Sequence, residues 1–361
     1  MGSIAASGFN PVGCSFFKTP RCASQPDCPS PWISNAIPRN AVAFASPSEA
    51  IEPRPAMQQR QHNNALGWLT NNGVLLAMIC TLIWGGNAIA GKFAVGNISP
   101  MLLTMLRWLI AAAIMLVLGW QHLRDDWPVI RKNLTYLFFA GALGFATFNG
   151  LLYSALNYST AINITILQSA MPMFVFLLNF LVFGLRMHWA QALGYSITLI
   201  GVLLVAGQGD IARLASLDIN FGDLIMLVAV VVYSAYSVAL RAKPEMHWMS
   251  FLTVLVMAAT VTSIPMAAVE FALGGTIVPT NITGWTVVFY TALFPSIVSQ
   301  GFWIRTNELL GGNTASLFFN MVPIFGAVLA VLILGETFHL YHAIALTMVV
   351  GGIVIAQKLA K

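Results

Sequence analysis

Ten long apolar runs follow one another along this chain, and they constrain its fold more than any other feature. A helix that crosses a membrane needs roughly 20 predominantly apolar residues, and each run is close to that length. In chain order the runs cover residues 73–95, 99–121, 133–157, 160–183, 189–208, 221–241, 249–273, 284–309, 312–334 and 338–358. The sequence therefore predicts an all-α membrane protein with ten transmembrane helices.

The composition excludes most other classes of protein. Charged residues make up 8% of the 361 residues, hydrophobic residues make up 58%, and the mean hydropathy is +0.79. Soluble domains carry about 25% charged residues, so an ordinary soluble enzyme, a disordered protein and a secreted disulfide scaffold are all excluded. The net charge of +5 is scattered along the chain, whereas a nucleic-acid partner would require a concentrated basic face. We expect no nucleic-acid partner.

Residues 1–65 differ in kind from the rest of the chain. They contain 9 of the 17 prolines, three of the four cysteines and many serines. Such a composition buries too little apolar surface to offset the entropy of ordering it, which predicts a disordered tail. The tail lacks the apolar core of a secretory signal, and its cysteine spacing favours free thiols over a zinc site. A plant-like transit peptide and a true start at Met57 are alternatives that the sequence leaves open.

The lysines and arginines predict the orientation of the spans. Cytoplasmic loops are enriched in these residues, and an even number of spans places both termini on one side. Nearly all of the 17 basic residues lie in the termini or in the loops of that side, and Arg213 is the exception among the loops. We therefore expect a multi-pass protein of the cell (inner) membrane with both termini in the cytoplasm.

The two halves, residues 73–208 and 221–358, are predicted to be repeats. An offset of 151 residues superimposes Asn149 and Gln300, Pro172 and Pro323, Gly184 and Gly335, and Gly201 and Gly352. An offset of 149 residues pairs Trp84 with Tyr233 and Lys92 with Arg241. Each half contains an odd number of spans, so the second half is expected to be inserted upside down. Inverted repeats of this kind build two equivalent gates around a central site in many transporters.

Several short motifs resemble those of the EamA-type transporters of the drug/metabolite transporter superfamily. The similar stretches are Leu82-Ile83-Trp84-Gly85-Gly86-Asn87 with Lys92, Ser99-Pro100, Leu106-Arg107-Trp108, Leu156-Asn157-Tyr158-Ser159-Thr160-Ala161, Pro172, Pro323, Leu334-Gly335-Glu336 and Gly351-Gly352. The resemblance covers nearly all of residues 73–358. It implies ten helices in two inverted EamA repeats that export or exchange small metabolites, and it does not identify the substrate.

One position departs from this pattern. The first repeat has Gly184-Leu185-Arg186 where the second has Gly335-Glu336. If the acidic residue acts in gating, only the second repeat retains it, so Glu336 is a candidate gate residue. Pro172 and Pro323 are candidate hinges, because a proline inside a helix removes one backbone hydrogen bond and displaces the carbonyl four residues earlier. We expect a kink in each of these two helices.

Polar and aromatic side chains within the spans are the candidates for substrate contact. A charge inside a membrane costs about 2.5–3.5 kcal/mol on insertion scales and usually faces protein or a water-filled cavity. Arg107 is therefore expected either to meet an anionic group of the substrate or to brace neighbouring carbonyls, whereas Lys92 is expected to extend to the headgroups. The full candidate set is Trp84, Asn87, Arg107, Asn149, Tyr153, Gln168, Tyr233, Tyr236, Gln300, Trp303 and Asn307. Asn149, Tyr153 and Asn157 on one span, and Gln300, Trp303 and Asn307 on another, are predicted to form two facing stripes.

The ionisable residues bear on energy coupling. All six histidines lie in loops, the tail or helix ends, and Glu270 is the one carboxylate placed within a span away from its last residues. A proton-coupled carrier usually needs an embedded relay of Asp, Glu or His. The pattern favours a uniporter or exchanger, unless Glu270 turns inward to pair with Lys92 or Arg107.

Rival functions lack the residues that they require. Asp125 and Asp126 look like a solvated cluster rather than a catalytic pair, and no phosphate-binding GxxxxGK[ST] loop is present. Glu336, His339 and His342 have a spacing that would suit a metal, but open loop histidines are usually not ligands. We expect no enzymatic activity, no metal and no cofactor.

The expected function is transport of small organic metabolites, amino acids or similar zwitterionic and amphipathic compounds, by alternating access. Exchange of nucleotide sugars or sugar phosphates ranks second, because it would require several cations in the cavity. A non-transporting membrane scaffold is the third alternative. The expected partners are a small-molecule substrate and the lipid bilayer, and a homodimer is left open.

Overall fold

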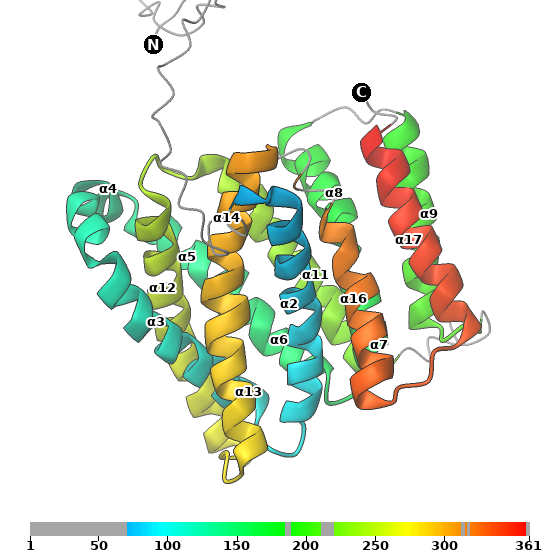
Figure 1. Cartoon of the computed structure of the whole chain (residues 1–361), viewed down its shortest axis with the longest axis horizontal. Coiled ribbons are helices and arrows are strands. Elements are labelled where there is room, and N and C mark those ends of the chain that lie inside the picture. The colour runs from blue at the N-terminus through cyan, green and yellow to red at the C-terminus, as the bar shows by residue number, and fades with distance from the viewer. Residues whose placement is uncertain (1–70, 185–188, 211–219, 312–314, 316–317, 359–361) are drawn as a thin grey trace, which may run out of the picture. The chain divides into compact units, whose positions relative to one another are not determined.

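The computed structural model is helical throughout the residues that it describes, and it contains no strand among them. Those residues are 71–184, 189–210, 220–311, 315 and 318–358. The expectations for residues 1–65, Leu185, Arg186 and Arg213 lie outside them. Figure 1 shows the helices running roughly side by side.

The first half of the chain forms a series of helices that match the expected runs closely. They are α2 (Gly73–Ala94), α3 (Pro100–Asp125), α4 (Trp127–Lys132), α5 (Leu134–Gly141), α6 (Phe148–Ala155), α7 (Ala161–Gln168), α8 (Met171–Phe183) and α9 (Trp189–Ala206). A π-helical segment, η1 (Ala142–Thr147), joins α5 to α6.

The second half repeats this order. Its helices are α11 (Phe221–Ala239), α12 (Trp248–Ala272), α13 (Ile282–Leu293), α14 (Ser299–Leu310), α16 (Met321–Leu329) and α17 (Leu340–Lys358). Its shorter segments are the 3-10 turns η2 (Leu240–Ala242) and η4 (Phe318–Asn320) and the π-helical segments η3 (Phe294–Val298) and η5 (Ala330–Leu334). The third span of each half therefore carries a π-helical segment near its middle.

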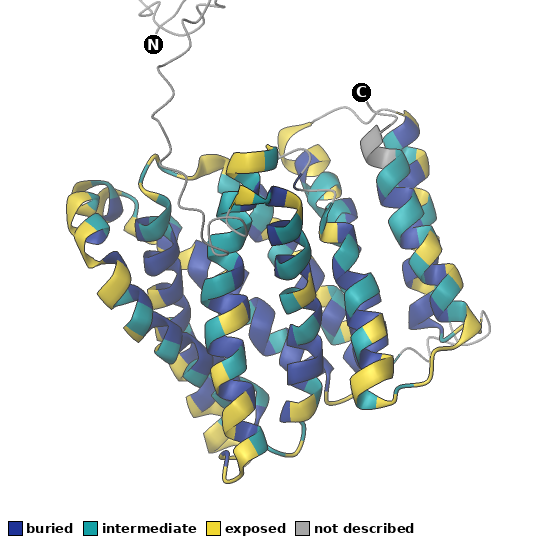
Figure 2. Ribbon diagram, in the orientation of Figure 1, coloured by how far each residue is buried: buried dark blue, intermediate teal, exposed yellow. Residues whose placement is uncertain are grey.

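Length and composition suit these helices to a membrane. In the described part of the chain, eight helices are long and apolar enough to cross a bilayer, and two shorter apolar helices cover Phe318–Leu334 and Leu340–Ile355. Large apolar side chains such as Val117 and Leu332 are exposed on the outside of the helices. Figure 2 shows the buried residues gathered on interior helices such as α6 and exposed ones along α4. A surface with so many exposed apolar side chains is suited to contact with lipid rather than water.

Equivalent helices of the two halves pack against each other. The contacts between α9 and α17 and between α3 and α12 are the most extensive in the fold, and Figure 1 shows α9 beside α17. Small residues allow the first pair to approach closely. A Cβ added at Gly352 of α17 would overlap the carbonyl oxygen of Gly194 and the hydroxyl of Thr198 on α9.

The fourth span is interrupted just before its proline. Helix α7 ends at Gln168, and α8 begins at Met171 with Pro172 in its first turn. Between them the backbone makes short turns, in which Ala170 N–H donates to the carbonyl of Leu167 at 3.0 Å. Pro172 has no N–H to continue the ladder, so a new helix starts there. Pro323 lies likewise in the first turn of α16, directly after the 3-10 turn η4.

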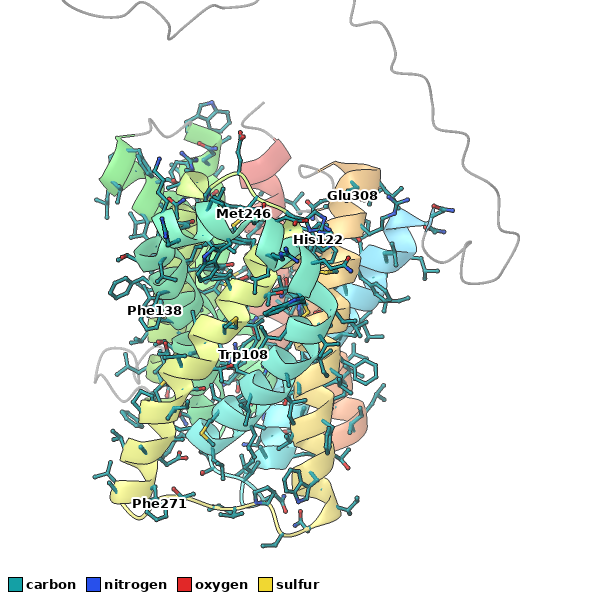
Figure 3. The ribbon with its side chains drawn as sticks, turned by 90° about the vertical axis from the view of Figure 1, so that its left-hand side faces the viewer. Trp108, His122, Phe138, Met246, Phe271 and Glu308 are labelled. Atoms are coloured by element: carbon teal, nitrogen blue, oxygen red, sulfur yellow. The ribbon has the colours of Figure 1, made fainter. Side chains whose placement is uncertain are left out.

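We call the two ends of the helix bundle proximal and distal. The proximal end is where α2 begins and α3 ends, and the distal end is where α2 ends and α3 begins. Figure 3 shows His122, Met246 and Glu308 toward the proximal end, Phe271 at the distal end and Trp108 between them.

Candidate functional site

A cavity of about 400 Å³ lies among the helices of both halves. Its lining comes from α2, α3, the third and fourth spans, α9, α11, the eighth span and the segment around η4. Binding pockets for small organic molecules occupy roughly 300–1,000 Å³ and combine apolar walls with a few placed polar groups. The cavity has the size and the mixed lining of such a pocket.

Seven of the eleven expected substrate contacts line this cavity. They are Trp84, Asn87, Arg107, Asn149, Gln168, Tyr233 and Gln300, and Pro172 and Pro323 line it as well. Residues of α8, the first half of α9 and the end of α11 complete the lining, for example Asn179, Tyr195 and Ser237. The cavity therefore extends from Arg107 toward the proximal end.

Four expected contacts do not line the cavity, and neither does Glu336. Tyr153 lies directly behind the cavity wall and is bonded to Arg107. Tyr236 packs edge-on against Phe145, with ring centroids 5.9 Å apart. Trp303 packs behind Trp84 and Phe319, and Asn307 donates to the Trp303 carbonyl.

The expected facing stripes therefore hold only at one end. Helix α6 ends at Ala155, so Asn157 falls in the turn beyond it and is exposed. On α14, Gln300 reaches the cavity, but one turn later Trp303 lies behind a pair of aromatic rings. The spacing of polar residues along a helix does not show which of them a neighbouring helix will cover.

Arg107 is the charged centre of the site. Its side chain is 3% exposed, and its Nε donates to Ser296 Oγ at 2.7 Å. Its Nη1 donates to Asn149 Oδ1 at 2.7 Å, to Asn87 Oδ1 at 3.4 Å and to the hydroxyl of Tyr153. Polar residues from three other spans thus fix the guanidinium in one place.

All of these partners of Arg107 are neutral. Across the described residues, the one ion pair within 4.0 Å joins Arg305 to Glu308 at the proximal end. A buried charge is costly unless it is paired and hydrogen-bonded. Arg107 is hydrogen-bonded but lacks a counter-charge within the described part of the chain.

Two residues of the cavity lining carry buried polar atoms that sequence reasoning missed. Trp108 Nε1 and Asn179 Oδ1 are buried, and neither has a hydrogen-bond partner among the described residues. Trp108 stacks on Phe145 with ring centroids 5.0 Å apart, and the Arg107 guanidinium lies 4.7 Å from the Trp108 ring centre. The sequence contains one indication that Asn179 could be functional, namely that it is a single amide side chain within an apolar helix.

Aromatic rings form much of the remaining wall. Trp84 stacks on Phe319 with centroids 5.1 Å apart, and Tyr233 lies 4.9 Å from Phe148. Phe145, Phe148 and Phe319 were not expected, because phenylalanine in an apolar run gives no sign of which face it occupies. These rings offer an apolar surface beside the polar Arg107 centre.

Polar contacts close the distal end. The Lys92 ammonium donates to the carbonyls of Leu156 and Ser159 at 3.0 and 2.8 Å, so it caps the end of α6 instead of extending to the headgroups. The Glu336 carboxylate accepts from the backbone N–H groups of Ala161 and Ile162 at 2.8 and 3.0 Å. These contacts tie α2 to the end of the third span and the second half to the start of α7.

Glu270 has a different role from the one considered. Its carboxylate accepts from Ser99 Oγ at 2.6 Å and from the N–H groups of Met101 and Leu102. It therefore caps the N-terminus of α3, where a negative charge is favourable, and pairs with neither Lys92 nor Arg107. Ser99 occupies the N-cap position before Pro100, but its hydroxyl donates to Glu270 and makes no capping bond to the helix itself.

The expectation that Glu270 is the one carboxylate within a span, and that the histidines lie at helix ends or in loops, needs correction for two buried ionisable groups. Asp223, in the first turn of α11, and His342, near the start of α17, are 0% and 2% exposed. Ser159 Oγ and Asn163 Nδ2 both donate to the Asp223 carboxylate, and His342 Nε2 lies 3.0 Å from Asn163 Oδ1. Their positions at the ends of apolar runs made them look like boundary residues. Within the described chain, no three His, Cys, Asp or Glu side chains form a metal-binding group.

The equivalent contacts are not made at the proximal end by the described residues. Arg241, the counterpart of Lys92, is exposed and lies over the ring of Phe183 at 5.5 Å. Leu185 and Arg186, which match Glu336 and its neighbour, lie outside the described residues. The distal end is thus closed by side-chain contacts to helix termini, and the cavity lies on the proximal side of them.

Comparison with known proteins assigns the chain to a family. The EamA-like transporter family model matches twice, over residues 71–207 and 220–357. The chain is similar to the "Uncharacterized transporter YyaM" of Bacillus subtilis, with 26% identity over 74% of this chain and 87% of that protein. It is also similar to the "Probable amino-acid metabolite efflux pump" of Escherichia coli, with 24% identity over 73% of this chain and 87% of that protein.

Two further similarities support the same placement. The "Uncharacterized inner membrane transporter YicL" of Salmonella typhimurium is 22% identical over 79% of this chain and 95% of that protein. A protein of known crystal structure shares the fold at a TM-score of 0.55 and 22% identity, over 80% of this chain and 97% of that one.

Proposed function

The chain belongs to the EamA-like transporter family, and on that premise we propose that it carries small organic metabolites with a carboxylate group, amino acids or similar compounds, across a cell membrane. We infer ten spans in two inverted repeats, residues 73–208 and 221–358, with both termini in the cytoplasm. The distribution of lysine and arginine supports this orientation. In this arrangement the proximal end faces the cytoplasm.

The observation that carries the proposal is the uncompensated charge of Arg107. Its Nε and Nη1 are held by neutral side chains at the cavity wall. A substrate carboxylate would supply the missing counter-charge and accept a bond from Nη2, which makes none within the described chain. Arginine suits this task because its planar fork matches the two oxygens of a carboxylate. The aromatic rings beside it would contact the apolar part of the same molecule.

The two ends of the molecule suggest how the carrier works. In this form the distal end is closed around Lys92 and Glu336, and the cavity extends toward the proximal end. Inverted repeats can exchange their conformations around a fixed site, and the breaks at Pro172 and Pro323 are proposed as the hinges. This form would then be the one that receives substrate from the cytoplasm, in export or in exchange.

A nucleotide-sugar or sugar-phosphate substrate is the weaker proposal. Several cations would be needed to hold its phosphate groups, and Arg107 is the one charged residue in the described cavity lining. Lys92 is committed to the end of α6. The relative described as an amino-acid metabolite efflux pump also favours the first proposal.

Counterflow in liposomes tests this function. The purified protein would be reconstituted in vesicles loaded with an unlabelled amino acid, and entry of the labelled compound would be followed for a panel of amino acids and their carboxylic acid analogues. We expect saturable counterflow of at least one carboxylate-bearing compound, and Arg107→Gln is expected to reduce it at least tenfold. Arg131→Gln, at an exposed arginine remote from the cavity, is the matched control. Counterflow of nucleotide sugars alone, or none with any compound, would refute the proposal.

A further inference from the structure

Two residues of the cavity lining, Trp108 and Asn179, each have a buried polar atom without a hydrogen-bond partner among the described residues. Buried polar groups in folded proteins nearly always have a hydrogen-bond partner, so each exception calls for an explanation. Trp108 is 2% exposed and Asn179 is 7% exposed, and both line the cavity. Neither Trp108 Nε1 nor Asn179 Oδ1 has a partner among the described residues.

The chemistry of each atom is unambiguous. The indole Nε1–H can only donate, so Trp108 lacks an acceptor. The amide of Asn179 already donates from Nδ2 to the carbonyl of Val175 at 2.9 Å. That bond fixes the orientation of the amide and leaves Oδ1, which can only accept. The residues of the lining thus include one unused donor and one unused acceptor, both buried.

The unused donor lies beside the charged centre. Trp108 follows Arg107 directly on α3, and the Arg107 guanidinium is 4.7 Å from the centre of the Trp108 ring. The two side chains are therefore in contact, and Arg107 Nη2 and Trp108 Nε1 both lack an acceptor in the described chain. A carboxylate has two oxygens and can accept from both.

The unused acceptor lies elsewhere in the same cavity. Asn179 belongs to α8, two helical turns beyond Pro172 toward the proximal end. A carboxylate oxygen would be repelled by Asn179 Oδ1, since both atoms are acceptors. An ammonium group would be attracted to it, and neutral hydroxyl and amide groups are weaker donors.

We propose that Trp108 and Asn179 are specificity-determining contacts of the substrate. Trp108 Nε1 shares the carboxylate with Arg107, and Asn179 Oδ1 accepts a hydrogen bond from the substrate's ammonium group. The site therefore selects amino acids over carboxylic acids of the same shape that lack the amine. This inference rests on the proposed function, because it concerns the selectivity of that same cavity.

The test compares pairs of compounds that differ only in the amine. Counterflow in proteoliposomes would be measured for L-leucine against 4-methylpentanoate and for L-phenylalanine against 3-phenylpropanoate. The wild-type protein is expected to prefer the amino acid by at least tenfold in at least one pair. Asn179→Leu, which keeps the volume but removes the acceptor, is expected to abolish this preference by slowing the amino acid and sparing the acid.

Two further variants separate the contacts. Trp108→Phe keeps the stacked ring and loses the N–H, so it is expected to slow the amino acid and the acid alike, by about fivefold. Asn179→Asp retains an acceptor and adds a charge, so it is expected to keep or increase the preference for the amine. Asn133→Leu removes an amide that makes the same bond to the carbonyl four residues earlier but lies outside the cavity. Asn133→Leu is expected to change neither the transport rates nor the preference for the amino acid.

The outcomes separate this inference from the proposed function. Wild-type transport of the amino acid and the acid at equal rates, unchanged in Asn179→Leu, would overturn the inference and leave the carrier function intact. Absence of wild-type counterflow for every compound would instead overturn the function. If Asn179→Leu fails to fold, Asn179→Asp provides the test instead. Loss of the preference for the amino acid over the carboxylic acid in that variant would count against the inference.

Discussion

Glu336 holds the N-terminus of a helix in the opposite half of the molecule, because its carboxylate accepts a hydrogen bond from the backbone N–H of Ala161 at 2.8 Å. The residue lies just after the ninth span, whereas Ala161 begins α7 in the first half. The first half has no acidic residue at the matching position, where Leu185 stands. The equivalent position of the first half therefore cannot make this contact.

Glu336→Ala should favour the form that is open at the distal end. A lost helix cap costs about 1–2 kcal/mol, which corresponds to a shift of roughly 5- to 30-fold between two conformations. A reporter Ala161→Cys, fully buried in this form, would be introduced into a chain without other cysteines and labelled with a water-soluble maleimide. We expect faster labelling in Glu336→Ala than in the parent. Glu308→Ala, at the proximal end, is the control, and equal labelling rates in both variants would contradict the role given to Glu336.

Lys92→Met should also favour the form that is open at the distal end. The ammonium of Lys92 caps the last carbonyls of the third span, and methionine preserves most of the apolar stem without the charge. We expect the same reporter to be labelled several times faster. Lys243→Met removes a cation that lies over the ring of Phe251 and should leave labelling unchanged. Slower labelling in Lys92→Met would show that the lysine favours the opposite form.

Asp223→Asn should destabilise the protein. The buried carboxylate accepts from both Ser159 and Asn163, and an amide can accept through only one of its two ends. One donor would then be left without a partner, which costs about 1–3 kcal/mol. We expect the midpoint of thermal unfolding to fall by several degrees in detergent. Asp125→Asn, at an exposed aspartate, should leave it unchanged, and an equal midpoint in both variants would argue against the buried network.

Neighbouring glycines on α17 offer a matched test of packing. A Cβ at Gly352 would overlap backbone and side-chain atoms of α9, whereas a Cβ at Gly351 would meet no atom within 4 Å. Overpacking of this kind costs about 1–3 kcal/mol, so Gly352→Ala should lower the unfolding midpoint. Gly351→Ala should be neutral or slightly stabilising, because alanine favours a helix. Both variants would be measured by thermal unfolding, and a reversed order would disprove the close packing of α9 on α17.

Much of the fold could be predicted from the sequence because a bilayer imposes a strong pattern. Runs of about 20 apolar residues have few alternatives to a spanning helix, and the described helices begin and end within a few residues of most predicted runs. The π-helical segment η1 could not be predicted, since Ala142–Thr147 carries no residue that distinguishes it from ordinary helix. In η3 (Phe294–Val298), Pro295 was a signal of irregular helix that was overlooked. The disturbance of the fourth span at Pro172 was predicted, but the length of the break between α7 and α8 was not, because it depends on what packs around the proline.

The candidate site was predictable to a lesser degree. Polar residues within spans, such as Asn87 and Asn149, were found because a membrane makes them costly and therefore conspicuous. Trp108 and Asn179 were missed because a missing hydrogen-bond partner is a property of three-dimensional packing. Asp223 was missed because it stands near the end of an apolar run, where a charge is ordinarily in contact with water. In the structure that end is covered by the opposite half of the chain.

The contact between α9 and α17 has a consequence for how the protein is made. Helix α9 leaves the ribosome before the second half exists, and its partner α17 follows all the other described helices in the chain. At about 5–20 residues per second, the face of α9 that includes Thr198 must wait roughly 10 to 30 s for the helix that covers it. During that interval the groove around Gly194 and Gly201 is open to lipid or to an insertion chaperone. Synthesis of α17 therefore covers this face of α9, and a chain truncated before α17 would leave it exposed.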